Sequence, residues 1–413
     1  MKNLKIFTDN IEEEAVKQIE LLLKQESFKK CKIRIMPDCH KGTGCVIGFT
    51  SNLGDKVIPN IVGVDIGCGV LCVKLGKREL DLDKLDKIIR DNIPSGRDVN
   101  ETIREKGFSA YTANVHNKLK EMKCYDKLQR IDWLENSLGT LGGGNHFIEI
   151  DVDEEGNKYL LIHTGSRNVG FQVCTIYQNI AVDYCSFEKR MKAEQAQLVK
   201  ECKQNGKEHL IYRGIEEIKK RYEGKKQIPK DLCYIEGKDL DNYLHDMKIC
   251  QAFANENRLD IAQTILCNLF DDVSFEEGNE SLEYFQCIHN YINFEDNIIR
   301  KGSISAHKGE KLLIPLNMRD GVILGVGKGN EDWNYSAPHG AGRIMSRMEA
   351  KKKLKLQDYK ASMSGIYTSC VSEDTIDEAP MVYKPMDEIV ENIKDNVEIE
   401  RIIKPIYNFK ASE

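Results

Sequence analysis

The sequence predicts an α+β fold: one large body of mixed sheets and helices over residues 1–413, with a helical insertion at residues 176–270. In both flanking segments, short runs rich in β-branched residues lie between glycine and proline, as is typical of strands. The segment between them is rich in Lys, Glu, Gln and Leu, poor in glycine, and has apolar residues at helical spacing. Because blocks of residues that could bind metal or act as nucleophiles occur in both flanks, we expect a single catalytic domain.

Each element follows from its local pattern. In residues 1–175 we expect strands at Ile33–Met36, Val46–Phe49, Val70–Val73, His146–Ile150 and Tyr159–Ile162. Helices are expected near Glu12–Gln25 and Leu80–Lys123, the second broken at Pro94-Ser95-Gly96. The insertion, interrupted at Gly224–Pro229, would form a lid or an arm. In residues 271–413, strands at Lys311–Ile314 and Val322–Val326 precede a helix from about Ala341 to Leu356.

Composition narrows the class of protein. The chain is 41% hydrophobic and 31% charged, as expected of a soluble globular protein, and has no run of about 18 apolar residues that could span a membrane. With no secretory signal at the N-terminus, we expect a cytoplasmic protein whose 14 irregularly spaced cysteines are mostly reduced and buried. The net charge of −6 argues against a generic nucleic-acid binder, so a polyanion would have to meet a local basic patch.

Five potential metal ligands lie at the ends of hydrophobic runs, and all but His289 are within two residues of a glycine: Asp65, Cys68, His146, His163 and His289. A closed structural zinc site usually shows paired Cys-x-x-Cys spacing, which these residues lack. One sulfur among five ligands favours an open centre, or two metals bridged by the thiolate, an arrangement that serves phosphoryl chemistry. Ligand type alone leaves Zn, Fe, Co and Mn open. His116, His209 and His245 read as surface residues, and His40 as a supporting or substrate-contacting residue.

His339 is the candidate base or covalent nucleophile, because Gly340-Ala341-Gly342 and an expected helix N-terminus follow it. Arg343, Arg347 and Lys351 follow at four-residue steps, which would place them on one helical face. For Arg347 and Lys351 a merely solvated helix face is the alternative. Amides of the loop at residues 142–145 could also cradle phosphate, but that loop has no P-loop lysine.

These blocks resemble the RtcB family of RNA-splicing ligases, and the resemblance runs from Met36 to Lys410. The most specific blocks are Gly63-Val64-Asp65-Ile66-Gly67-Cys68-Gly69, Gly143-Gly144-Asn145-His146-Phe147, His163-Thr164-Gly165-Ser166-Arg167 and His339-Gly340-Ala341-Gly342-Arg343. The resemblance implies an RtcB-like body and a GTP- and Mn²⁺-dependent ligase. Such an enzyme joins an RNA 3′-phosphate or 2′,3′-cyclic phosphate to a 5′-hydroxyl, in RNA repair or tRNA splicing.

Position by position, the resemblance implies that the five ligands hold two Mn²⁺, with Cys68 bridging, and that His339 becomes guanylylated. It also implies a set of guanylate contacts: Asn145, His146, Phe147, Ile148, Glu149, His289, Asn290, Pro315, Asn317, Met318, His339, Gly340, Ala341, Gly342 and Lys410. As partners we expect RNA with 3′-phosphate and 5′-hydroxyl ends and an archease-like activator, and we expect the protein to be a monomer.

The chain departs from the family pattern after Pro315. Serine-type contacts are replaced by Asn317 and Val322, and Arg319 and Asp320 add charges. Pro338 precedes His339, where the family often has cysteine. These changes favour a divergent bacterial-type branch that acts in RNA repair. Two other readings stay open: a dinuclear metallophosphoesterase that uses His339 only as an acid or base, and a non-catalytic RNA-end-binding paralogue.

Overall fold

Strands from both flanks meet in a larger and a smaller sheet in the computed structural model, which describes residues 3–102, 107–224 and 227–411. The larger sheet has the order β13-β14-β17-β6-β7-β5-β9, with β16 beside β17. Its strands are β5 (Gly69–Gly76), β6 (Phe147–Val152), β7 (Lys158–Thr164), β9 (Tyr284–Ile288), β13 (Lys311–Asn317), β14 (Gly321–Gly327), β16 (Tyr367–Thr368) and β17 (Val397–Phe409). The α+β prediction is confirmed.

The smaller sheet has the order β1-β2-β3-β11-β10. Its strands are β1 (Leu4–Ile6), β2 (Ile33–His40), β3 (Ile47–Asn52), β10 (Asn290–Asn293) and β11 (Ile298–Lys301). Two short pairs complete the strands: β4 (Lys56–Val57) with β8 (Ile235–Glu236), and β12 (Ser303–Ser305) with β15 (Ser336–Pro338). The expected strands of both flanks all coincide with observed strands, although β3 begins one residue later than Val46 and β6 one residue later than His146.

The helices of the first flank are shorter than expected. They are α1 (Glu13–Leu23), α2 (Pro59–Val62), α3 (Leu82–Asn92), α4 (Ala110–Ala113), α5 (Val115–Lys120) and α6 (Ile131–Glu135). The helix expected near Glu12–Gln25 is confirmed as α1. The stretch expected at Leu80–Lys123 starts as α3 and stops before Pro94, as its sequence predicts; beyond the break only α4 and α5 are helical among the described residues, and residues 103–106 lie outside them.

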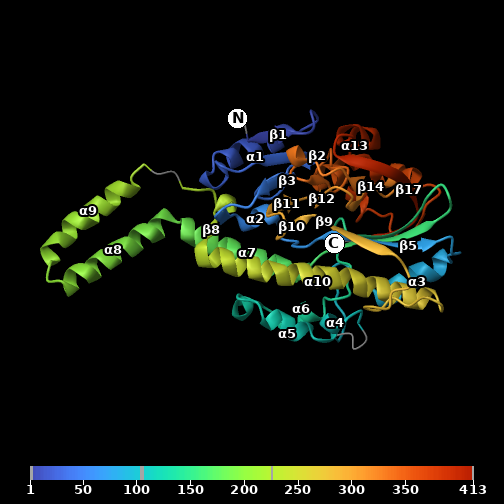
Figure 1. The fold of residues 1–413 in the computed structure, drawn as a ribbon, viewed down its shortest axis with the longest axis horizontal. Helices are drawn as coiled ribbons and strands as arrows, with labels where there is room; N and C mark the ends of the chain where they lie inside the picture. The colour runs from blue at the N-terminus through green and yellow to red at the C-terminus, as the bar shows by residue number, and fades with distance from the viewer. Residues whose placement is uncertain (1–2, 103–106, 225–226, 412–413) are drawn as a thin grey trace.

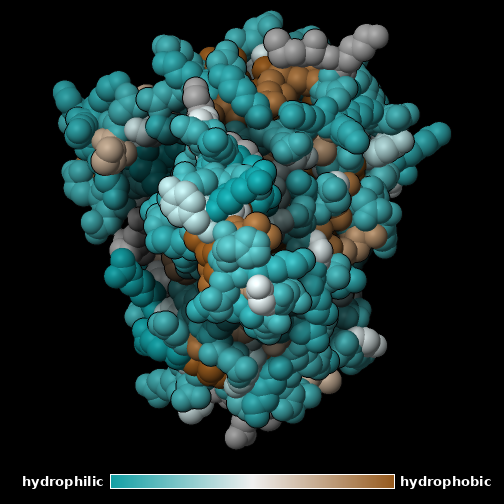
Figure 2. Space-filling view, turned by 90° about the vertical axis from the view of Figure 1, so that its left-hand side faces the viewer, coloured by the Kyte–Doolittle hydropathy of each residue, from teal (hydrophilic) through white to brown (hydrophobic). Residues whose placement is uncertain are grey.

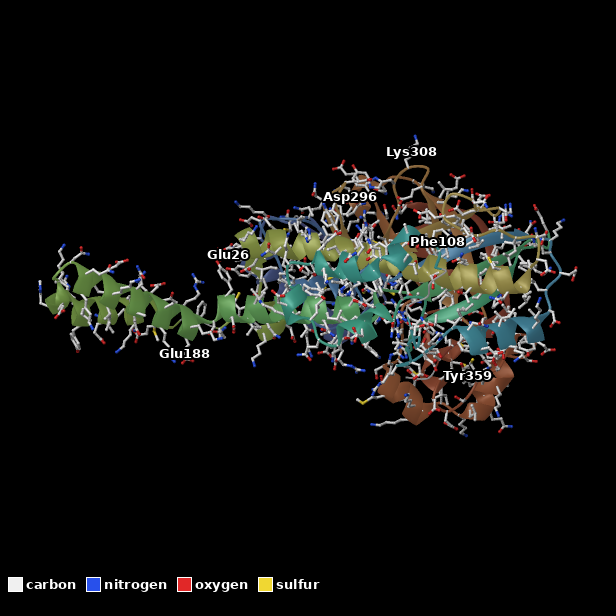
Figure 3. All side chains as sticks on the ribbon, turned by 90° about the horizontal axis from the view of Figure 1, so that it is seen from below. Glu26, Phe108, Glu188, Asp296, Lys308 and Tyr359 are labelled. Carbon is white, nitrogen blue, oxygen red and sulfur yellow. The ribbon has the colours of Figure 1, made fainter. Side chains whose placement is uncertain are left out.

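Four helices occupy most of the expected insertion: α7 (Arg167–Cys185), α8 (Phe187–Gln204), α9 (Ile211–Tyr222) and α10 (Gly237–Leu269). Of these, α7 and α10 pack along the body, whereas α8 and α9 project from it as a two-helix arm (Figure 1). Glu188 marks this arm in Figure 3, far from Tyr359 on α12 (Leu356–Ser362). The expected interruption at Gly224–Pro229 follows the end of α9, and residues 225–226 lie outside the described ones.

Hydrophilic side chains dominate the face from which the arm projects, and the apolar patches on it are separate (Figure 2). The core lies instead between the sheets and helices: Ile148 and Ile150 of β6 pack with Ile265 of α10, while Phe147 faces a second apolar cluster with β13 and β14. Within the described ranges, we find no helix with the length and apolar character of a membrane span.

The prediction that a helix begins near Ala341 is wrong. The observed helix α11 (Arg347–Lys353) begins six residues later, and α12 and α13 (Met386–Ile393) follow it. Ser346 caps α11 in a reciprocal capping box with Glu349. Gly342 has a φ of 77° and lies so close to the Asp38 backbone that a β-carbon there would collide with it. The chain after His339 is therefore an extended loop that lines the site.

Candidate metal and nucleotide site

The five predicted metal ligands lie together at one edge of the larger sheet. Asp65 and Cys68 precede β5, His146 precedes β6, His163 lies near the end of β7, and His289 follows β9. In the register of these antiparallel strands, Gly69 is opposite both Thr164 and Ile288, and Phe147 is opposite His163. The strand pairing thus brings residues from four distant sequence blocks to one point.

Cys68 is the centre of a continuous chain of ligand atoms. Its Sγ lies 3.5 Å from His146 Nε2 and 3.3 Å from His163 Nε2. On one side, His146 Nε2 is 3.0 Å from Asp65 Oδ2, and on the other, His163 Nε2 is 3.4 Å from His289 Nε2. Because the sulfur lies between these two groups, it is the atom best placed to be shared by two metal ions.

The backbone orients two of the imidazoles for metal binding. His146 Nδ1 is 2.9 Å from the Leu141 carbonyl oxygen, and His163 Nδ1 is 3.1 Å from that of Asn145. Since a carbonyl oxygen only accepts hydrogen bonds, each Nδ1 carries the proton and each Nε2 keeps its lone pair. Burial lowers the pKa of His163 and of His289 well below the usual value, so both rings are neutral at pH 7.

Burial shifts the pKa of the Cys68 thiol in the opposite direction from the pKa of these imidazoles. Burial, reinforced by the nearby Asp65 carboxylate, raises its pKa well above the usual range. A metal ion bound here would therefore displace the thiol proton, and its binding would release that proton to solvent. The donor set of one sulfur, one carboxylate and three imidazoles fits a divalent transition metal.

Two buried residues of α10, Asn257 and Arg258, support the loops that carry these ligands. The Asn257 amide oxygen accepts hydrogen bonds from the Gly139 and Thr140 amides. The Arg258 guanidinium donates to the Gly67 carbonyl oxygen at 2.9 Å and to that of Thr164 at 2.8 Å. Neither residue was predicted from the sequence, because a buried Asn-Arg pair within a long helix has no local signature of such contacts.

His339 follows β15, and its ring centroid lies 4.7 Å from that of His289. Its Nδ1 is 2.7 Å from Asp38 Oδ2, and its backbone amide donates to the same oxygen at 3.1 Å. Asp38 is fully buried, so the carboxylate fixes both the orientation and the tautomer of the ring. Asp38 was not predicted from the sequence, although His40, two residues later, was a candidate for a supporting or substrate-contacting role.

His339 lies in the wall of a cavity of about 920 Å³, within the size range of ligand pockets. The cavity is lined by most of the residues that the resemblance assigns to guanylate: Asn145, Phe147, Glu149, His289, Asn290, Pro315, Asn317, Met318, His339, Gly340, Ala341, Gly342 and Lys410. His146 lies behind the wall, in the ligand chain. Ile148 is fully buried and packs on the opposite face of β6.

The divergent residues after Pro315 form the turn between β13 and β14. Asn317 Oδ1 accepts hydrogen bonds from the Arg319 and Asp320 amides, and its Nδ2 donates to Asp320 Oδ2 at 2.8 Å. The side chain of Asn317 thus closes this turn, and the Arg319–Asp320 ion pair lies beside it. Val322 is buried in β14, opposite Pro315.

The basic residues after His339 are arranged differently from the expected helical stripe. Arg343 lies in the extended loop, and only Arg347 and Lys351 lie on α11. All three still converge, because each contacts the side chain of Asp377 or Glu378.

This geometry defines a class of site: a buried imidazole–thiolate–carboxylate centre with a histidine nucleophile candidate in a nucleotide-sized cavity. The sequence model of the RtcB family, described as tRNA-splicing ligase RtcB, matches residues 23–411. The chain therefore belongs to the RtcB family.

Individual relatives match over similar lengths. The RNA-splicing ligase RtcB of Escherichia coli (strain K12) is 31% identical over 391 residues, which cover 89% of this chain and 87% of the relative. The tRNA-splicing ligase RtcB of Nanoarchaeum equitans (strain Kin4-M) is 27% identical over an alignment of 441 positions, which covers 86% of this chain and 83% of the relative. The tRNA-splicing ligase RtcB of Archaeoglobus fulgidus (strain ATCC 49558 / DSM 4304 / JCM 9628 / NBRC 100126 / VC-16) is 25% identical over an alignment of 456 positions, which covers 92% of this chain and 87% of the relative.

Proposed function

We propose that this protein is a GTP- and Mn²⁺-dependent RNA ligase that joins a 3′-phosphate or 2′,3′-cyclic phosphate end to a 5′-hydroxyl end through a GMP–His339 intermediate. The observation that carries the proposal is the pairing of His339 with buried Asp38 beside the Cys68-centred ligand chain. Neither a phosphoesterase nor an RNA-end binder needs a covalent nucleophile in a nucleotide-sized cavity.

Two Mn²⁺ would be held by Asp65, Cys68, His146, His163 and His289, with the Cys68 thiolate shared between them. Bound there, the metals would neutralise charge on phosphoryl oxygens close to His339. The remaining chemistry belongs to side chains of the protein. Asp38 accepts a hydrogen bond from the Nδ1–H of His339, which leaves the Nε2 lone pair free to attack phosphorus.

In the first step, His339 Nε2 forms a bond to the α-phosphorus of GTP, and the bond to pyrophosphate breaks. In the second, an oxygen of the RNA 3′-phosphate attacks that phosphorus, and the histidine leaves with its electron pair. A 2′,3′-cyclic phosphate end must first be opened to the 3′-phosphate by water, which forms a bond to phosphorus as the bond to the 2′-oxygen breaks. In the third, the 5′-hydroxyl oxygen attacks the activated 3′-phosphorus, loses its proton and expels GMP. Asp38 offsets the positive charge that the ring acquires whenever Nε2 is bonded to phosphorus.

The proposal is tested by incubating the protein with [α-³²P]GTP and Mn²⁺ and separating it on a denaturing gel. We expect a label that is labile in acid, stable in alkali and dependent on Mn²⁺. His339→Ala should abolish the label and keep the metal, whereas His209→Ala, a control at a histidine between α8 and α9, should be labelled like the wild type. Loss of metal from His339→Ala would show that His339 is a ligand.

The two rival functions predict different results in the same experiment. A metallophosphoesterase would release phosphate from RNA ends without forming a covalent nucleotide. An RNA-end binder would show metal-dependent RNA affinity and no turnover. For the cellular setting we propose a cytoplasmic monomer that acts in RNA repair with an archease-like activator; sedimentation of the free protein and RNA-end rescue assays with and without that partner test these points.

A further inference from the structure

Glu378 is a buried carboxylate at the end of the 3₁₀ turn η6 (Ile376–Glu378), and it accepts hydrogen bonds from donors on three other segments. Its Oε2 lies 2.9 Å from Lys410 Nζ and also accepts from the Tyr383 hydroxyl. Its Oε1 lies 3.2 Å from Arg343 Nη1 and 2.8 Å from Arg347 Nη1. One carboxylate therefore links the C-terminal lysine to the loop after the nucleophile.

The neighbouring Asp377 faces a different set of cations. Its carboxylate contacts Arg347 at 2.6 Å and Lys351 at 3.6 Å, and no contact with Lys410 is found among the described residues. The two carboxylates lie next to each other in the chain, and of the two, Glu378 is the one bonded to Lys410. This difference provides a matched pair of positions for separating the roles of the two acids.

Lys410 is held from two sides. Its side chain is 5% exposed and lies near the Phe147 ring, with Nζ 5.6 Å from the ring centroid. An ammonium group has three N–H donors. One is directed to Glu378 and a second to the Asn145 carbonyl oxygen at 3.4 Å; among the described residues the third has no acceptor, so it remains for a ligand in the cavity that Lys410 lines.

A fixed ammonium donor discriminates between purine bases. Guanine presents a carbonyl oxygen at C6, which accepts a hydrogen bond from an ammonium group. Adenine presents an amino group there, which only donates, so the third N–H of the buried ammonium would be left without an acceptor. This discrimination requires the ammonium to be held in one place, since a long flexible side chain that is free to move could turn toward other acceptors.

We propose that Glu378 is a positioning residue that holds Lys410 where its free N–H selects a guanine nucleotide over an adenine nucleotide. The inference rests on the proposed function, because it concerns the nucleotide that labels His339. Glu378 also contacts Arg343 and Arg347, but Lys410 is the cation that carries the base preference in this proposal. Glu378 therefore affects the choice of base through Lys410.

The test measures KM and the maximal rate of His339 labelling with GTP and with ATP. In Glu378→Gln the amide keeps the shape of the side chain and loses the charge that holds the ammonium. We expect the ratio of KM for ATP to KM for GTP to fall about tenfold or more, the effect of one lost discriminating hydrogen bond, with the maximal rate for GTP changed less than about threefold. General destabilisation would change the active fraction for both nucleotides equally and leave the ratio unchanged.

Two further variants identify the route of the effect. Asp377→Asn, which alters the same turn but not the Lys410 contact, should keep the wild-type ratio. Lys410→Met should lower the ratio by itself, and adding Glu378→Gln to it should lower the ratio no further if Glu378 acts through Lys410. If Glu378→Gln does not fold, Glu378→Asp, which keeps the charge but withdraws it by one methylene, should give a smaller fall in the ratio.

The outcomes separate this inference from the function on which it rests. If wild type forms no nucleotide adduct, the proposed function fails. If wild type is labelled by GTP in preference to ATP and a folded Glu378 variant keeps that preference, the positioning role is overturned and the ligase proposal stands. A further fall in the Lys410→Met background would equally overturn the claim that Glu378 acts through the lysine.

Discussion

Replacing Asp38 with asparagine tests the arrangement of His339 most directly, because it removes one charge and almost no volume. In the native site, Asp38 Oδ2 accepts hydrogen bonds from both Nδ1 and the backbone amide of His339. Asp38 Oδ1 is buried and has no hydrogen-bond partner within the described residues. The carboxylate thus holds the proton on Nδ1 and leaves Nε2 free.

An asparagine has two ways to fit this site, and both impair the nucleophile. If its oxygen replaces Oδ2, the amide nitrogen is buried without an acceptor at the place of Oδ1, which costs about 1–3 kcal/mol. If its nitrogen replaces Oδ2, His339 must carry its proton on Nε2 and cannot attack. In both cases the charge that offsets the developing imidazolium is lost. By analogy with a serine-protease triad, where this change costs about 10⁴-fold, we expect labelling of His339 to slow by about 10²–10⁴-fold.

The assay is single-turnover labelling with [α-³²P]GTP at saturating Mn²⁺, with metal content and thermal stability measured on the same preparations. Asp38→Asn should bind metal like the wild type, because Asp38 is not part of the ligand chain. A labelling rate within about threefold of wild type, in a folded and metal-loaded variant, would refute the assignment of Asp38 as the residue that fixes the histidine tautomer.

The metal centre, its supporting loops and Glu378 each give one further prediction. Cys68→Ala should lose both of the proposed Mn²⁺ ions together, because our proposal has the sulfur shared between them; full retention of one metal in elemental analysis would exclude the bridge. Asn257→Leu should lower the free energy of unfolding by about 3–5 kcal/mol and weaken Mn²⁺ binding, since it leaves buried loop amides unpaired. The control Asn268→Ala, on the same helix, should change the free energy of unfolding by less than about 0.5 kcal/mol. Equal denaturation midpoints for the two variants would contradict this prediction. Burial opposes ionisation of Glu378, yet the ammonium and guanidinium groups around it lower its pKa to about 2, below the ordinary 4.5. It therefore stabilises the fold above about pH 4.5 by about 3 kcal/mol, a contribution lost as pH falls toward 2, so wild type and Glu378→Gln should converge in stability in acid titrations.

The candidate metal ligands could be proposed from the sequence because each lies at the end of a strand-forming run and all but His289 lie within two residues of a glycine. Strand runs give the positions of β5, β6 and β7, and the ends of paired strands necessarily meet at a sheet edge. The prediction for Cys68, His146 and His163 thus needed only local patterns, and the structure brings their ligand atoms within 4.8 Å of one another.

The helix after His339 could not be placed by the same reasoning, because Gly340 and Gly342 suit a phosphate-binding helix start and a tight loop equally well. The better local signal was Ser346 followed by Glu349, which form the capping box of α11. Asp38 and Glu378 were missed for another reason: their contacts with His339 and Lys410 span 301 and 32 residues of chain. Single-sequence patterns do not specify such pairs.

The change from a helix start to a loop alters how this site would attract a polyanion. A helix N-terminus offers about half a positive charge, whereas Arg343 offers a guanidinium that is held in a fixed place and shares the Glu378 carboxylate with Arg347 and Lys410. Its guanidinium donates to the Met345 and Asp377 carbonyl oxygens and to Glu378, which uses three of its five N–H groups. The two N–H groups that have no acceptor among the described residues are also held in place, because the other three anchor the guanidinium. In a chain of net charge −6, such anchored local cations, rather than the overall charge, must draw an anionic substrate to His339.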